Sequence, residues 1–222
     1  MTSPIRWGVA VAALMACHSA GSGGAKTSPE PAAGYGQTSQ QPSSPPGKYP
    51  YTQADVDFMT HMIAHHGQAL VMAGWAPTHG ANQSIRTLAG RIINGQQDEI
   101  ATMQRWLRDR GQPVPEPGGG TMKMAGHEHN MHQMLMPGML TDDQMKELDQ
   151  ARGADFDRLF LTYMIQHHRG ALTMVNQLFG TEGAAQEQTT FKLASDVSAD
   201  QSTEVARMER MLADLKPAQS TP

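Results

Sequence analysis

The sequence predicts an all-α protein, a four-helix bundle built from two repeated helical hairpins. The chain contains an internal repeat, and each copy consists of two segments. All four segments place apolar residues three and four positions apart, which is the spacing of a helix face; none alternates apolar and polar residues as strands do. A single hairpin is too small to bury its own apolar face, so we expect the two hairpins to pair.

The first segments of the two copies, residues 58–72 and 160–174, are identical at nine of fifteen positions with a spacing of 102. The second segments share Leu-Ala, Gln, Glu, Met, Arg and Leu with a spacing of 105. Thr52 with Asp55, and Thr141 with Gln144, have the spacing of capping boxes and predict helix starts. The folded domain is therefore predicted over residues 50–216, with repeat one at 51–110, a Met/His-rich loop at 111–140 and repeat two at 141–216.

The N-terminus resembles a bacterial lipoprotein signal peptide. In residues 1–17 one arginine precedes an apolar run that is too short to span a membrane as a helix. The run ends in Leu-Met-Ala-Cys, similar to a lipobox, in which the cysteine is lipidated. We expect Cys17 to anchor the protein on the extracytoplasmic side of a bacterial membrane, in the periplasm or at the cell surface. An ordinary secreted protein with a spare thiol is the alternative.

Residues 18–49 consist mainly of Ser, Gly, Pro, Gln and Ala. Such a stretch buries too little apolar surface to offset the entropy of ordering, so we expect a disordered N-terminal tether. A flexible chain of this length has a mean reach of roughly 30 Å.

Composition limits the function of the chain. A net charge of −4 in 222 residues excludes a general nucleic-acid binder, which would carry a basic excess. One cysteine permits no intramolecular disulfide and no Cys-x-x-Cys site. The chain nevertheless has 17 methionines and 10 histidines. A bound metal would therefore be held by imidazole, thioether or oxygen ligands.

Polar residues interrupt the apolar seams of the second and fourth helices: Gln96 and Glu99, then Gln201 and Glu204. A buried carboxylate requires a partner or access to water. The first and third helices offer one through a repeated Met-x-x-His-His motif, in which a thioether and two imidazoles share one helix face. Its residues are the candidate metal ligands Met62, His65, His66, Met164, His167 and His168.

Di-iron bundles combine Glu from two helices with Glu-x-x-His from the other two. Here methionine replaces that second Glu in both copies, which shifts the preference from iron toward Cu(I). We expect Glu99 and Glu204 to orient histidines rather than to bind the metal directly. Alternatively, the methionines only fill the core and the histidines are structural.

The predicted loop between the repeats is the second candidate metal site. Residues 121–139 contain six methionines and three histidines, and the glycines and prolines just before them oppose a regular helix. Histidine suits Cu(II) and methionine suits Cu(I), although the methionines could instead absorb oxidants. The candidate ligands are Met122, Met124, His127, His129, Met131, His132, Met134 and Met136.

Three motifs resemble the bacterial family called domain of unknown function 305, over about residues 50–215. They are the doubled Phe-x-x-x-Met-Ile-x-His-His, the Gln-x-x-Glu-[Ile/Val]-x-x-Met of the following helices, and Met-Pro-Gly-Met-Leu-Thr before the second repeat. The resemblance implies a ferritin-like four-helix bundle exported from the cytoplasm. Some family members are similar to periplasmic copper-binding proteins with Met and His ligands. This implicates the two Met-x-x-His-His motifs of the present chain.

The leading hypothesis is an extracytoplasmic copper-binding lipoprotein that sequesters or transfers Cu(I) or Cu(II), and not an enzyme. The expected partners are the metal ion and, through the lipid, a membrane; a homo-oligomer is also compatible with the bundle. One alternative is a ferritin-like metal oxidase, in which Asp55 and Asp157 would have to join Glu99 and Glu204. Another is a structural surface lipoprotein without metal.

Overall fold

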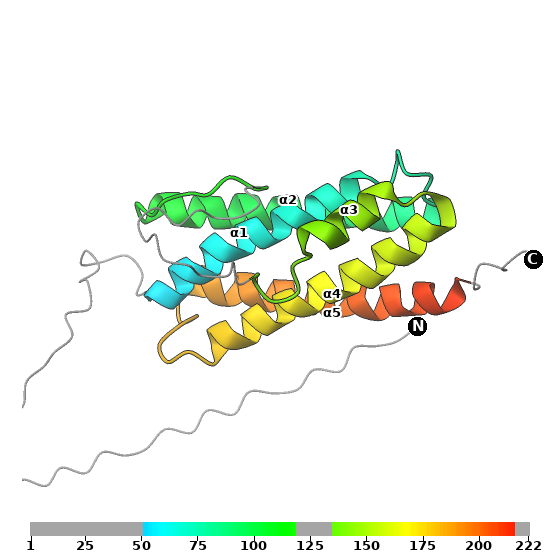
Figure 1. The fold of residues 1–222 in the computed structure, drawn as a ribbon. Coiled ribbons are helices and arrows are strands. Elements are labelled where there is room, and N and C mark those ends of the chain that lie inside the picture. The colour runs from blue at the N-terminus through cyan, green and yellow to red at the C-terminus, as the bar shows by residue number, and fades with distance from the viewer. Residues whose placement is uncertain (1–50, 119–134, 216–222) are drawn as a thin grey trace, which may run out of the picture. The chain divides into compact units, whose positions relative to one another are not determined.

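The computed structural model describes residues 51–118 and 135–215. These residues form five helices and no strand, which confirms the all-α prediction (Figure 1). The predicted signal peptide, Cys17 and the tether lie outside them. No helix within the described ranges has the length and apolarity that a membrane span requires. The helices are α1 (Gln53–Gly74), α2 (Gln83–Asp109), α3 (Asp142–Gln150), α4 (Gly153–Phe179) and α5 (Gln188–Asp214).

The four long helices form the predicted pair of hairpins. Helix α1 packs mainly against α2, and α4 mainly against α5. Contacts between α1 and α4 join the hairpins, so the helices that carry the Met-x-x-His-His motifs lie next to each other (Figure 1). The short helix α3 packs on both α1 and α4.

Both predicted capping boxes are present, and the second starts a short helix in addition to the four predicted segments. Thr52 and Asp55 cap α1 reciprocally, whereas the capping box at Thr141 starts the nine-residue α3. The chain becomes extended at Ala151 and Arg152, which ends α3 and separates it from α4. The part of the chain predicted as the second repeat, 141–216, therefore begins with a short separate helix before α4.

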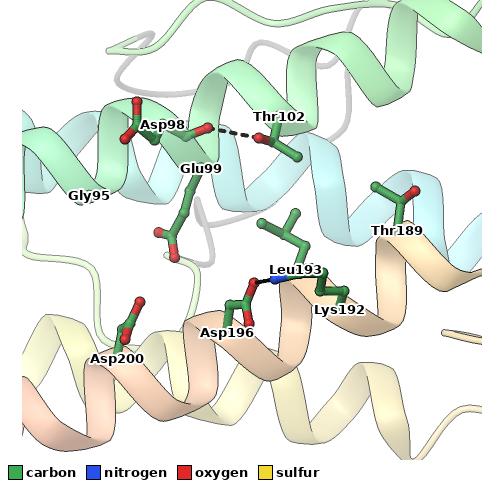
Figure 2. A pocket seen from close by; sticks show the side chains of 9 residues that line it. All are labelled: Gly95, Asp98, Glu99, Thr102, Thr189, Lys192, Leu193, Asp196 and Asp200. Atoms are coloured by element: carbon green, nitrogen blue, oxygen red, sulfur yellow. Dashed lines mark hydrogen bonds and ion pairs between the residues drawn. The ribbon is translucent and has the colours of Figure 1, made fainter.

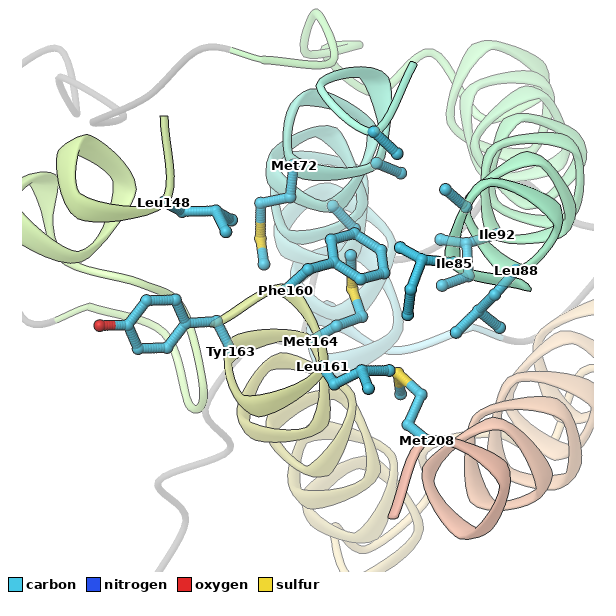
Figure 3. Packing of buried hydrophobic residues seen from close by; sticks show 14 of the residues in the cluster. Met72, Ile85, Leu88, Ile92, Leu148, Phe160, Leu161, Tyr163, Met164 and Met208 are labelled. Carbon is cyan, nitrogen blue, oxygen red and sulfur yellow. The ribbon is translucent and has the colours of Figure 1, made fainter. Parts of the chain in front are cut away.

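The apolar core consists of two clusters. The first core cluster takes residues from Ala69 onward in α1 and residues up to Ile165 in α4. The second takes residues up to Ile63 in α1 and from Ala171 onward in α4. Figure 3 shows side chains of α1, α2, α4 and α5 meeting in the first core cluster, with Leu148 of α3 at its side. The histidines of both motifs lie between the two clusters in sequence and in space.

Truncation of Phe160 tests this core. Its side chain is fully buried in the first core cluster, so Phe160→Ala should lower the free energy of unfolding by about 3–5 kcal/mol. Phe191→Ala is the matched control, because Phe191 is 56% exposed; its effect should stay below about 1 kcal/mol. Urea unfolding followed by circular dichroism measures both. Equal losses in the two variants would contradict the described core.

Candidate metal centre

Four fully buried histidines form a polar layer between the two core clusters. This histidine layer consists of His65 and His66 of α1 and His167 and His168 of α4. The rings of His65 and His167 are in contact, with their centroids 3.8 Å apart and their planes tilted by 38°. The close packing of α1 on α4 therefore brings the two motifs together, which the sequence could suggest only through the repeat.

Each outer histidine of the layer is bonded to a carboxylate of the neighbouring helix. Nε2 of His66 donates to Oε2 of Glu99 at 2.6 Å, and Nε2 of His168 donates to Oε2 of Glu204 at 2.7 Å. The two glutamate side chains are 15% and 25% exposed, so each carboxylate reaches solvent while holding a buried ring. This is the arrangement expected of residues that orient histidines, while their role toward a metal stays a prediction.

The inner histidines are held by backbone carbonyls. Nε2 of His65 donates to the carbonyl oxygen of Pro137, and Nε2 of His167 donates to that of His65, both at 3.0 Å. A carbonyl oxygen only accepts, so the proton of each neutral ring must be on Nε2. The other ring nitrogen, Nδ1, is then unprotonated and carries a free lone pair.

Nδ1 of all four histidines is buried and has no hydrogen-bond partner among the described residues. Buried polar atoms without partners are uncommon because each one lowers the stability of the fold. A group of four in one layer therefore indicates a site that a ligand completes. Metal-binding histidines nearly always donate the other ring N–H to a carboxylate or a carbonyl. All four histidines of the layer already make such a bond through Nε2.

Burial keeps the inner histidines neutral. It lowers the pKa of His65 from 6.5 to about 3, and the neighbouring His66 adds to the shift. Burial and then the nearby His65 hold the pKa of His167 well below its usual value. At neutral pH both rings therefore keep a free lone pair, which is the form that binds metal.

The motif methionines flank the layer on opposite sides. Met62 and Met164 are fully buried; Met62 belongs to the second core cluster and Met164 to the first. Within the described ranges, no three His, Cys, Asp or Glu side chains converge into a ready-made metal site. The residues fit a metal only if thioether sulfur completes the set of imidazole ligands, which makes the donor set soft.

The other sequence candidates lie elsewhere. Met136 is half-buried against the second core cluster. The remaining loop candidates lie outside the described residues: Met122, Met124, His127, His129, Met131, His132 and Met134. Asp55 accepts hydrogen bonds from Thr52 and from the backbone of Ala185, and Asp157 accepts them from Asn82. These two aspartates fix helix ends and do not reach the histidine layer.

A groove between α2 and α5 leads to one of the orienting carboxylates. Its volume is about 420 Å³, and Glu99 forms part of its wall opposite Asp196 and Asp200 (Figure 2). Partial burial and the charges of Glu99 and Glu204 raise the pKa of Asp200. Asp196 and Asp200 precede Glu204 by eight and four residues and so share its helix face, a spacing that indicates in the sequence that they lie near the site.

These features define a class of protein: an all-α bundle whose apolar core is divided by a layer of buried, oriented histidines. The chain belongs to the family described as Domain of unknown function (DUF305), whose profile matches residues 55–212. The resemblance noted in the sequence is thereby confirmed. A sequence comparison with curated proteins finds no match.

Several solved structures have the same fold. A DUF305 fragment from Deinococcus radiodurans is 27% identical and covers 74% of this chain and 98% of its own, with a TM-score of 0.61. A DUF305 protein from Streptomyces coelicolor, inferred to be secreted, is 26% identical with coverages of 76% and 98% and a TM-score of 0.62. CopM in a Cu(II)-bound form is 29% identical with coverages of 73% and 97% and a TM-score of 0.57; a Cu(I)-bound form also matches.

The neutrality of the inner histidines predicts a pH dependence of stability. Below pH 6.5 the unfolded chain takes up protons at His65 and His167, whereas the folded chain does not. The metal-free protein should therefore lose stability as pH falls from 6.5 toward 3, by about 1.4 kcal/mol per pH unit for each histidine. Urea unfolding between pH 7 and pH 4 measures the slope.

The matched controls for this slope are glutamine variants. The double variant His65→Gln, His167→Gln should show a flatter pH dependence than the wild type. His61→Gln replaces a half-buried histidine outside the layer and should keep the wild-type slope. An unchanged slope in the double variant would show that the inner histidines are not the titrating groups.

Proposed function

We propose that this protein is an extracytoplasmic copper-binding protein that sequesters or transfers copper ions and is anchored to a membrane through a lipid on Cys17. The observation that carries the proposal is the histidine layer: four buried imidazoles whose Nε2 is held by an oxygen acceptor and whose Nδ1 has no partner among the described residues. The copper- and silver-bound forms of the structural neighbour CopM support a copper-related role.

The donor chemistry favours copper over harder metals. In each motif the methionine precedes the first histidine by three residues and the second by four, so the three side chains share a helix face. Thioether and neutral imidazole suit Cu(I), and imidazole suits Cu(II). An oxidase of the di-iron type would need further carboxylates, but Asp55 and Asp157 are engaged at helix ends.

The location of the protein is inferred from two lines of support. One neighbour is inferred to be secreted, which favours a location outside the cytoplasm. Residues 1–17 have the pattern of a lipoprotein signal, and lipidation would remove the single cysteine from metal chemistry. Imidazole and thioether are then the remaining soft ligands.

Anaerobic competition with a Cu(I) chelator tests the proposal. The protein should withdraw Cu(I) from the chelator, and X-ray absorption should show both sulfur and nitrogen ligands. The triple variant Met62→Leu, His65→Gln, His66→Gln should lose the copper bound in the bundle and keep any that the Met/His-rich loop binds. Met59→Leu with His61→Gln is the matched control, because it removes one methionine and one histidine just outside the motif.

Two results would contradict copper binding. One is a purified protein that fails to withdraw any Cu(I). The other is a thermal stability that stays the same with Cu, Zn or Ni, because a ligand that binds only the native state must stabilise it. If both results were obtained, the protein would be a structural helical bundle that binds no metal.

A substitution of Glu99 tests the orientation of His66 more specifically than the triple variant does. Glu99→Gln weakens the acceptor that holds His66, so Cu(I) affinity should fall roughly 10- to 100-fold. Asp98→Asn removes the same charge from the same groove wall without touching the histidine, and its affinity should stay within about threefold of the wild type. If the two variants lose affinity equally, the effect is long-range charge and not orientation of His66.

A further inference from the structure

One of the four acceptors in the histidine layer comes from outside the helices. His66 bonds to α2, His168 to α5 and His167 to the backbone of α1. His65 instead bonds to the carbonyl of Pro137, which lies 72 positions further along the chain and before α3. The orientation of this ring therefore depends on how a turn docks on the bundle.

The turn reaches His65 because two glycines allow backbone-to-backbone contact. A Cβ on Gly170 of α4 would lie 1.9 Å from the carbonyl oxygen of Pro137 and 2.5 Å from Cα of Gly138. Gly138 has a φ of +76°, and a Cβ there would lie 2.5 Å from the carbonyl oxygen of Gln166. No side chain fits at either position, so the same oxygen that bonds to His65 rests on Gly170.

The turn is also tied to both motif helices by glutamine side chains. Gln68 of α1 accepts from the backbone N–H of Leu140 at 2.8 Å and donates to its carbonyl at 3.0 Å. Gln166 of α4 donates to the carbonyl of Gly138 at 3.4 Å. These bonds fix the turn relative to α1 and α4, so the position of the Pro137 carbonyl is set from two sides.

The repeat departs from its own pattern where the turn docks. Gln68 and Gly170 occupy equivalent positions at the spacing of 102, yet one bonds to the turn and the other makes room for it. Gln166 likewise replaces Ala64 of the first copy. Gln68, Gln166 and Gly170 thus serve the same turn, and each differs from the residue at the equivalent position of the other copy.

We propose that the turn Pro137–Gly138, seated on Gly170, is a positioning element of the metal centre. It fixes His65 in the tautomer that has its proton on Nε2, and thereby keeps Nδ1 available as a ligand. The metal-binding consequence rests on the proposed function, whereas the tautomer does not. Gly170 has no side chain that could serve as a ligand, and it acts only through the Pro137 carbonyl.

The first readout needs no metal. In the metal-free, ¹⁵N-labelled full chain, two-bond ¹H–¹⁵N correlation spectra should show His65 with a protonated Nε2 and a bare Nδ1. Gly170→Ala should displace the turn and change the His65 ring signals, leaving His168 bonded to Glu204. Gly90→Ala is the control, because a Cβ there meets nothing within 4 Å. A wild-type His65 with its proton on Nδ1 would overturn the proposal.

The second readout is Cu(I) competition. Gly170→Ala should weaken binding roughly tenfold or more, while Gly90→Ala should stay within about twofold of the wild type. In a His65→Gln background, Gly170→Ala should cause no further loss, because its effect passes through that ring. A further loss of the same size in that background would mean that the glycine acts on the whole bundle and not on His65.

A third variant tests the proposal if the Gly170→Ala chain does not fold. Gln68→Leu loosens the turn without a steric clash, and it should alter the His65 signals in the same direction. Unaltered His65 signals in this folded variant would overturn the proposal. If the wild type binds no Cu(I) while its His65 tautomer is as expected, the copper function fails and the positioning role of the turn stands.

Discussion

The rest of the structure depends on four hydrogen bonds that fix buried imidazoles in the middle of an apolar core. An imidazole without an acceptor for its N–H would make burial unfavourable, and a protonated one would be worse. Each acceptor comes from a different place: α2, α5, the backbone of α1 and the turn before α3. The same bonds that orient the histidines therefore join α1 to α2, α4 to α5, the two hairpins to each other, and the turn to the bundle.

The histidine layer buries polar atoms at a cost in folding free energy, and the apolar packing on both sides of it offsets that cost. Its four Nδ1 atoms have no partners within the described part of the chain, and neither do the buried amides of Gln96 and Gln201. Two apolar clusters, one on each side, supply the packing that holds this polar section together. Proteins commonly keep such local costs where a ligand removes them, which is the physical argument for a binding site here.

The internal repeat explains the symmetric half of the site, and its exceptions explain the rest. Glu99 and Glu204 hold equivalent histidines in equivalent ways. Tyr163, in contrast, replaces His61 of the first copy and donates to Glu147 of α3. That bond raises the pKa of Tyr163 to about 12. Differences between the copies thus mark where the segment that joins the repeats docks.

The sequence by itself determined the all-α class, the paired hairpins, both capping boxes and the pairing of Glu99 and Glu204 with histidines, because helical spacing and a repeat are local, periodic signals. It did not reveal that the helix begun by the second capping box ends at Ala151 and Arg152, before α4. Only the tertiary structure decided which ring nitrogens are free. That depends on contacts between distant segments, above all the Pro137 carbonyl on His65, and a backbone carbonyl is the same in every residue type.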